Sequence, residues 1–206
     1  MVSRTVHVLL VMAGLATLAA ACADLTEPQG TRSPVHPRLT LYDPPIDVTV
    51  LQRTVPLAAP ISASAVIGRG GGTISIPAAG FSISFPANSI QGGKPTLITV
   101  TALPGSNVAY EFQPEGLVFH NDPMITQDLK VTAVFGDPSL RNSLEGAYFP
   151  DTTYLGNGTA RIRETRPTVV DVNGWRMKWN VHHFSGYLAS TGRIGGYIGS
   201  SGFIGF

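Results

Sequence analysis

The sequence predicts an all-β fold, and three features favour strands over helices. Among its 206 residues are 23 glycines and 16 prolines, which supply turns. Only 13% of the residues are charged, whereas globular proteins usually carry about 25%. Short segments of alternating polarity, separated by Gly, Pro and Asn, follow one another from Ala65 onward. We therefore expect one β domain with appendages at both ends.

Each expected strand places its apolar side chains on one face. A period of two is typical of strands that are buried on one side only. The segments are 73–77, 81–85, 96–102 and 125–135, and their apolar positions are Ile74, Ile76, Phe81, Ile83, Phe85, Ile98, Val100, Ala102, Ile125, Leu129, Val131, Ala133 and Phe135.

A hairpin is predicted around Asn173-Gly174. Asn-Gly is the strongest short signal for a two-residue type I′ turn, because both central positions need positive φ. Pairing outward from this turn sets Asp171 against Arg176, so one face of the hairpin carries an opposite-charge pair and the other is apolar. A second hairpin is expected over residues 155–162.

The parity of the apolar residues changes near the end of the domain. Trp179 and Val181 share one parity, whereas Phe184 and Leu188 fall on the other. A bulge or bend near His182 is therefore expected if all four are buried.

Seven or more short strands fit two antiparallel sheets packed as an immunoglobulin-like β-sandwich. We expect a signal peptide over residues 1–21 and a Pro-rich tether over 22–64 that has room for one edge strand. The sandwich is expected over 65–189. Residues 190–206 form a Gly-rich segment, expected as a flexible tail or a loosely added strand.

The N-terminus has the pattern of an export signal. Arg4 precedes an apolar run, which is shorter than the ~18 to 20 residues of a spanning helix. The only cysteine, Cys22, follows three alanines and resembles the lipid-attachment site of a bacterial lipoprotein. A lone cysteine has no disulfide partner in an oxidising compartment. We expect a lipid anchor at Cys22.

The expected location is the bacterial cell envelope. Asp24 is two places after Cys22, not next to it, so the commonest signal for retention in the inner membrane is missing and the outer membrane is favoured. Residues 19–21 also fit the ordinary A-x-A cleavage pattern, which would release a soluble periplasmic protein.

Residues 70–188 resemble the ZU-five domain, a β-sandwich shared by zonula occludens proteins, Unc-5 netrin receptors and ankyrins. The matching residues are Gly71, Gly72, Phe85, Pro86, Ile90, Pro114, Gly116, Phe119 and Pro123. The resemblance implies a non-catalytic module that binds or scaffolds other proteins, here an unknown envelope protein or polysaccharide.

One branch of that family cleaves its own backbone within a His-Phe-Ser motif, which matches His183, Phe184 and Ser185. The implied chemistry is attack by the Ser185 hydroxyl on the carbonyl of Phe184, with His183 as acid or base, followed by hydrolysis of the ester. The alternative is that Phe184 anchors the core and that His183 and Ser185 hydrogen-bond locally at the end of a strand.

Other classes of function have weaker support. The net charge of +1 gives no field that would attract nucleic acid. No zinc spacing or phosphate-binding loop occurs, so neither a metal nor a cofactor is expected. Trp175, Trp179 and Tyr187 would suit a carbohydrate-binding platform, although aromatics beside a hairpin usually lie in the core. His120 is a candidate partner of Asp122.

Overall fold

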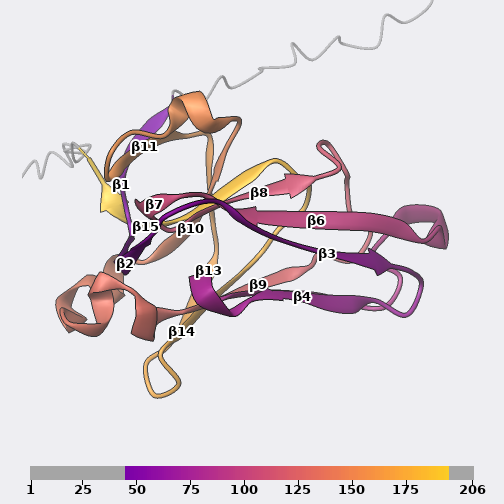
Figure 1. Cartoon of the computed structure of the whole chain (residues 1–206), viewed down its shortest axis with the longest axis horizontal. Helices are drawn as coiled ribbons and strands as arrows, with labels where there is room; N and C mark the ends of the chain where they lie inside the picture. Colours follow the sequence, from indigo (N-terminus) through magenta and orange to yellow (C-terminus); the bar gives the residue numbers. More distant parts are fainter. Residues whose placement is uncertain (1–44, 195–206) are drawn as a thin grey trace, which may run out of the picture. The chain divides into compact units, whose positions relative to one another are not determined.

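The computed structural model describes residues 45–194 (Figure 1). Cys22, the predicted signal peptide and most of the predicted Gly-rich tail lie outside the described residues. The strands are β1 Ile46–Val50, β2 Gln52–Leu57, β3 Ile61–Ile67, β4 Gly72–Ile76, β5 Phe81–Phe85, β6 Thr96–Ala102, β7 Gly105–Asn107, β8 Ala109–Gln113, β9 Met124–Asp128, β10 Glu145–Phe149, β11 Thr159–Ile162, β12 Glu164–Arg166, β13 Thr168–Asp171, β14 Arg176–Asn180 and β15 Gly186–Arg193.

Between residues 45 and 194 helix is confined to short 3₁₀ segments, and the predicted all-β fold is confirmed. These segments are η1 Pro77–Ala79, η2 Gln91–Gly93, η3 Leu129–Val131, η4 Ala133–Phe135, η5 Pro138–Ser143 and η6 Thr152–Tyr154. No helix between residues 45 and 194 is long and apolar enough to cross a membrane.

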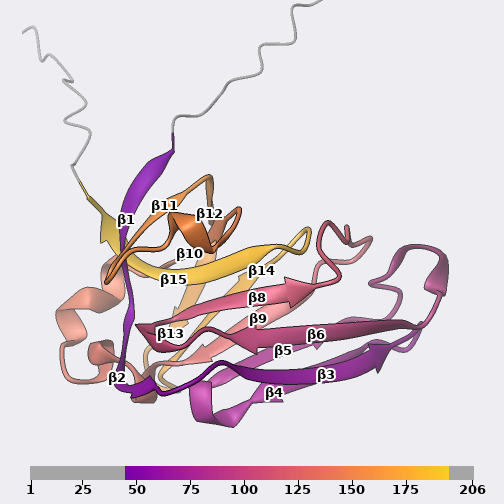
Figure 2. The same ribbon diagram turned by 45° about the horizontal axis from the view of Figure 1, so that its top comes forward.

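Two antiparallel sheets dominate the described part of the chain (Figure 2). The large sheet has eight strands in the order β11-β1-β15-β8-β6-β3, with β10 paired to β15 and β12 paired to β10. The small sheet has five strands in the order β13-β14-β9-β5-β4, and β2 pairs with β7 in a separate ribbon. Side chains from both sheets form one apolar core, which includes Ile83 and Trp179 from the small sheet and Phe112 and Tyr187 from the large sheet.

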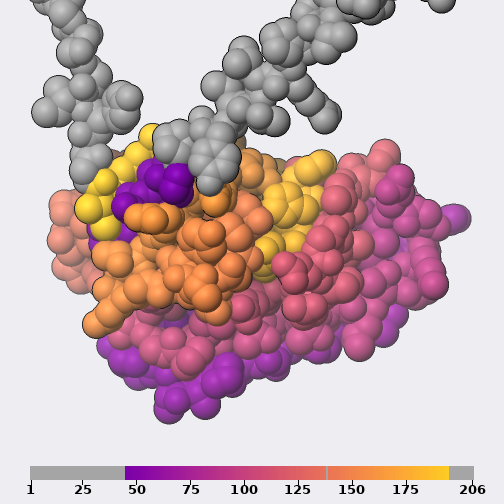
Figure 3. Space-filling view, turned by 90° about the horizontal axis from the view of Figure 1, so that it is seen from above, coloured from indigo at the N-terminus to yellow at the C-terminus, as the bar shows by residue number. Residues whose placement is uncertain are grey.

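A second apolar cluster lies on the other face of the large sheet. Val48, Phe149, Ile162 and Leu188 belong to it, and Figure 3 shows the segment that contains β11 and β12, in orange, at the surface beside the violet start of β1. Neighbouring residues of β15 therefore point into different cores, and Tyr187 and Leu188 are both 0% exposed. Strand β15 is held from both sides because of this double burial.

The alternation predicted for β4, β5 and β6 is confirmed, because every apolar position that it assigned to the core there is buried. In residues 125–135 the prediction is right as far as Leu129 and wrong beyond it. Strand β9 ends at Asp128, whose carboxylate accepts a hydrogen bond from the N–H of Lys130 (2.9 Å) and so begins a 3₁₀ turn. As a result Val134 is buried and Phe135 is 48% exposed.

The predicted hairpin exists in the predicted register, with Asp171 opposite Arg176. Its turn type was wrong, since neither Asn173 nor Gly174 has positive φ and the left-handed residue is Trp175 (φ 51°). The Asp171 carboxylate accepts hydrogen bonds from the N–H groups of Asn173 (3.1 Å) and Gly174 (2.9 Å). These bonds stabilise a four-residue loop in place of the tight turn.

The left-handed conformation of Trp175 has a tertiary cause. Its ring lies 4.6 Å from the Phe135 ring, and the Arg141 guanidinium lies 3.8 Å above it. The carbonyl of Trp175 also accepts a hydrogen bond from the N–H of Leu129 (2.8 Å). These contacts come from distant residues, so local turn propensity did not reveal them.

Both ends of the domain extend beyond the predicted limits. The segment predicted as a tether contains β1, β2 and the first four residues of β3. Strand β1 is not an edge strand, because it pairs with β11 on one side and with β15 on the other, and its Val48 and Val50 are buried in the second cluster. At the other end, β15 continues to Arg193, which pairs with Val48, so the first residues assigned to the tail belong to the sheet.

Candidate site at His183, Phe184 and Ser185

The His-Phe-Ser segment links the two main sheets. Strand β14 of the small sheet ends at Asn180, and β15 of the large sheet begins at Gly186. The bend predicted near His182 is confirmed, because the chain leaves its strand there. The segment is not a regular strand, and only His183 forms an isolated bridge, to Val118.

The backbone of the segment pairs with residues 116–119. Phe184 donates its N–H to the carbonyl of Leu117 (2.8 Å), and the Phe184 carbonyl accepts from the N–H of Gly116 (2.9 Å). The His182 carbonyl accepts from the N–H of Phe119 (3.0 Å). The carbonyl that self-cleavage would attack is therefore already held by one backbone donor.

The Phe184 side chain is a centre of the main core. Its ring is 1% exposed and stacks on Phe112 with ring centroids 4.9 Å apart. The Phe119 ring meets it edge-on at 4.7 Å, and the Phe85 ring does so at 6.2 Å. Offset-stacked and edge-to-face geometries are the favourable ones for aromatic pairs, so Phe184 anchors the crossover in the core.

The Ser185 hydroxyl donates a hydrogen bond to the carbonyl of Pro150 (3.0 Å). It also borders a recess of about 90 Å³ that Glu111, Glu115 and Asp151 line with it. Such a volume is enough for water but small for a larger ligand. The hydroxyl therefore satisfies a main-chain acceptor and has access to water.

The residue after the motif has to be glycine. A Cβ on Gly186 would lie 2.4 Å from two ring carbons of Phe149. The Phe149 ring belongs to the second cluster, so this contact presses β15 closely against β10.

The His183 ring contacts aromatic rings. It meets Tyr148 edge-on at 4.7 Å and lies 6.2 Å from Tyr187. Burial and the positive charge of Arg166 lower the pKa of His183 from its usual value, and Glu164 acts in the opposite direction. The imidazole is therefore neutral over a wider range of pH than a free histidine.

The main-chain carbonyl of His183 is also engaged. The Tyr187 hydroxyl donates to it at 2.9 Å, and burial raises the pKa of Tyr187, so that hydroxyl keeps its proton. Among the hydrogen bonds of residues 45–194, none joins the His183 ring to the Ser185 hydroxyl. The structure thus brings the three motif residues into one segment without pairing the candidate base with the candidate nucleophile.

The other residues singled out in the sequence lie elsewhere. Trp179 and Tyr187 are buried in the main core, as is usual for aromatics beside a hairpin, and the Trp175 ring lies under the Arg141 guanidinium, so the three rings do not form the alternative surface platform. His182, and not the candidate His120, pairs with Asp122 through Nδ1 and Oδ1 (2.9 Å). The link between β14 and β15 brings His182 beside the loop that contains Asp122. Sequence spacing alone does not show this proximity.

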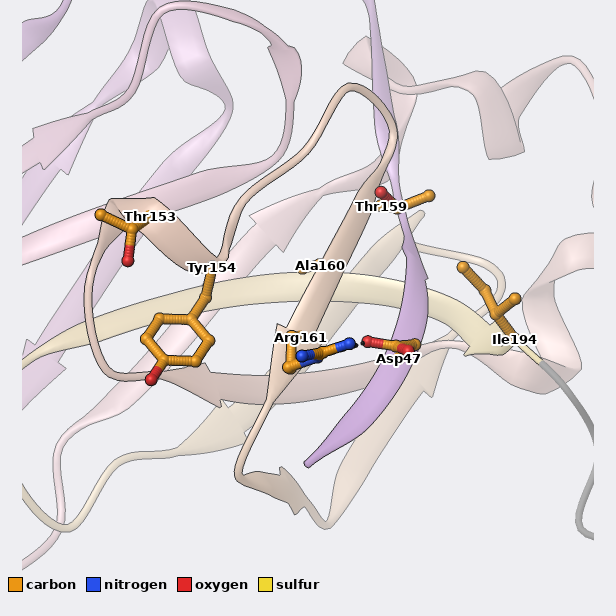
Figure 4. Close-up of a pocket in the computed structure, with 7 residues that line it drawn as sticks. All are labelled: Asp47, Thr153, Tyr154, Thr159, Ala160, Arg161 and Ile194. Atoms are coloured by element: carbon orange, nitrogen blue, oxygen red, sulfur yellow. Dashed lines mark hydrogen bonds and ion pairs between the residues drawn. The ribbon is translucent and has the colours of Figure 1, made fainter. Parts of the chain in front are cut away.

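Sequence reasoning also missed an open recess of about 490 Å³ beside β1 and β11 (Figure 4). The ion pair between Asp47 and Arg161 (3.0 Å) crosses it, with Tyr154 on one side and Ile194 on the other. These residues are far apart in the sequence, and no local motif marks them. Both charges are about half exposed, and exposed pairs of this kind contribute little to stability.

Metal chemistry has no visible basis in residues 45–194, since no three His, Cys, Asp or Glu side chains gather there in a way that would hold an ion. Neither a scan against protein-family models nor a search of curated proteins found a match.

Proposed function

We propose that this chain is a non-catalytic binding or scaffolding module of the bacterial cell envelope. The observation that carries the proposal is the use of the His-Phe-Ser segment as a link between sheets. Phe184 fills the core, and the Ser185 hydroxyl donates to the Pro150 carbonyl and not to the His183 ring. Each residue of the motif thus has a structural contact of its own.

The domain is ZU-five-like, with an immunoglobulin-like sandwich arrangement. Two antiparallel sheets that share one apolar core support this assignment, as do the glycines and prolines quoted above. Exposed apolar side chains support a binding role, because Val66 on β3 (64% exposed) lies opposite Leu97 on β6 (61% exposed). Its partner is another envelope protein or a polysaccharide.

A lipid on Cys22 holds the module at the membrane, with the outer membrane favoured. The position of the single cysteine after an export signal supports this part of the proposal. Acyl chains contribute about 0.8 kcal/mol per buried CH₂, so Cys22→Ser is expected to move the protein from the membrane fraction to the soluble fraction. A Cys22→Ser protein that still sediments with membranes after a salt wash would show the anchor to be wrong.

Intact-mass spectrometry under denaturing conditions tests the non-catalytic assignment. After prolonged incubation, the purified full chain is expected to give one undivided mass. A large fragment ending at Phe184 and a small one beginning at Ser185, which co-purify under native conditions, would overturn it.

Self-processing is the second candidate, and two observations favour it. The N–H of Gly116 lies where it would stabilise negative charge on the Phe184 oxygen, and the lowered pKa of His183 leaves a neutral imidazole that accepts a proton. The Ser185 oxygen would bond to the Phe184 carbonyl carbon as the peptide C–N bond breaks. His183 would pass the hydroxyl proton to the released amine, and water would then cleave the ester.

Ser185→Ala separates the two candidates. If the protein processes itself, the parent gives two masses under denaturing conditions and the Ser185→Ala variant gives one. If it does not, the variant and its parent both give one mass, and the only loss is a hydrogen bond that contributes about 1 kcal/mol.

A further inference from the structure

Strand β3 forms one border of the large sheet. It pairs with β6 along all seven of its residues, and no other strand of the described part pairs with its second side. After β3 the chain turns through a bridge between Gly68 and Gly71 and enters the small sheet as β4. In Figure 2 strands β8, β6 and β3 follow one another, and β3 is outermost. An unpaired border of this kind presents free backbone groups.

The hydrogen bonds of β6 show which backbone groups are free. Leu103, next to β6, donates its N–H to the carbonyl of Ala109 on β8 (3.0 Å). Backbone groups alternate in direction along a strand, so the odd-numbered residues of β6 face β8 and the even-numbered ones face β3. Ala102 is opposite Ile61 in the register, so the odd-numbered residues of β3 bond to β6.

It follows that Ser62, Ser64 and Val66 turn their N–H and C=O groups toward the unpaired border of β3. All three side chains are exposed on the outer face of the sheet. The Ser62 and Ser64 hydroxyls bond only within the sheet, to Thr101 (2.8 Å) and Thr99 (2.7 Å). No strand of residues 45–194 pairs with these groups, and the nearby β4 belongs to the small sheet.

Strand β3 lacks the usual protection of an edge. Natural edge strands carry charged residues, proline or a bulge that prevent further pairing. The segment Ile-Ser-Ala-Ser-Ala-Val-Ile has no charge and no proline, and its register with β6 is continuous. In contrast β13, at the border of the small sheet, follows Pro167 and ends at Asp171.

The segment is nearly the same when it is read in either direction, with Ser64 at its centre. In an antiparallel pair about Ser64, this residue faces Ser64 of a second copy, Ala63 faces Ala65, and Ile61 faces Ile67. Only Ser62 and Val66 differ across the axis. In such a pair only a residue at the two-fold axis faces its own copy, and the uncharged strand places no like charges against each other there.

We propose that β3 pairs with β3 of a second copy of this chain, antiparallel about Ser64, and joins two large sheets into one. The facing residues Ser64 with Ser64, and Ser62 with Val66, are those with free backbone groups, so each pair exchanges two N–H···O bonds. The palindrome selects this register, and the direction of the free groups is compatible with it. The described ends of the chain, at the start of β1 and the end of β15, lie at the opposite side of the sheet (Figure 2).

Native mass measured over a range of concentrations tests the pairing. The full chain carrying Cys22→Ser, which excludes association through lipid, is expected to reach twice the mass of one chain. Ser64→Lys places two like charges at the axis and is expected to raise the dimer dissociation constant at least about tenfold. A protein that stays monomeric into the millimolar range, or a Ser64→Lys dimer as tight as its parent, would overturn the proposal.

Thr99→Lys is the matched control. Thr99 is the cross-strand neighbour of Ser64 on the same outer face and shares its side-chain hydrogen bond. Ser64→Lys and Thr99→Lys both remove that hydrogen bond and add one lysine, but only Ser64→Lys adds it on the border strand. Thr99→Lys is therefore expected to dimerise like the parent, and equal weakening by both variants would contradict the pairing.

Amide hydrogen exchange of the unsubstituted strand tests the same pairing without relying on a variant that folds. The amides of Ser62, Ser64 and Val66 are expected to exchange slowly at high concentration and quickly on dilution. Those of Ala63 and Ala65 bond to β6 and are expected to stay protected throughout. Fast exchange of the first three at every concentration would refute the dimer. These measurements are independent of the proposed function, which the denatured mass and membrane fractionation test.

Discussion

Replacing Phe184 by alanine tests whether the crossover is anchored in the core. The ring is 1% exposed and touches three other aromatic rings. Truncating a buried phenylalanine costs about 3 to 5 kcal/mol, and an aromatic pair adds roughly 0.5 to 1.5 kcal/mol beyond its buried area. We expect a loss of about 4 kcal/mol, because the cavity would be walled by Phe112, Phe119 and Phe85, whose positions the two sheets fix.

Urea unfolding measures this loss, with the fluorescence of buried Trp179 as the probe. In a domain of this size 1 kcal/mol shifts the thermal midpoint by about 2 to 4 °C, so Phe184→Ala is expected to lower it by roughly 8 to 16 °C. Val169→Ala serves as the control, since that side chain is 69% exposed and surface changes usually stay within about 0.5 kcal/mol. A loss below about 1 kcal/mol for Phe184→Ala would refute the anchoring role.

Three further predictions concern close contacts and pH. Gly146→Ala is expected to lower the melting midpoint, because its Cβ would lie 2.4 Å from Cγ of Trp179, whereas Gly70→Ala, with no atom within 4 Å, should leave it unchanged. Gly174→Val is expected to destabilise the hairpin because its Cβ would lie 2.3 Å from Oδ2 of Asp171, and an unchanged midpoint would remove that explanation. The lowered pKa of His183 means that the unfolded chain binds more protons than the folded one between the folded pKa and the usual value of 6.5. Stability is therefore expected to fall as the pH drops below about 6.5. His183→Gln should flatten this slope, and identical slopes in the parent and the variant would contradict the assignment.

The strands of the two sheets were predictable where one face meets the core. In β5 the side chains of Phe81, Ile83 and Phe85 are buried and those of Ser82 and Ser84 face outward to differing degrees, which is the pattern that the period of two describes. The prediction of a strand failed where a hydrogen bond from the backbone to a side chain took the place of hydrogen bonds between strands. Asp128 redirects the backbone by accepting from an N–H two residues later, and alternation of polarity carries no information about such a bond.

The candidate site was predictable only along its own segment. The change of parity between Val181 and Phe184 marked the bend, because both residues had to reach a core. The partners of the motif are Gly116, Pro150 and Tyr148, which arrive from other parts of the fold. No spacing in the sequence relates them to His183 or Ser185.

The link between β14 and β15 explains the sequence His-Phe-Ser-Gly by packing and hydrogen bonding, without any catalytic role. A chain that leaves one sheet for the other has to place a large apolar side chain between them, and Phe184 does so. The next residue lies where the Pro150 carbonyl needs a donor, which a serine hydroxyl supplies, and the one after it has no space for a Cβ. A short motif match therefore cannot distinguish a self-cleaving segment from a link between sheets. The distinction rests on the contact between His183 and Ser185, and here the hydroxyl is directed to a carbonyl.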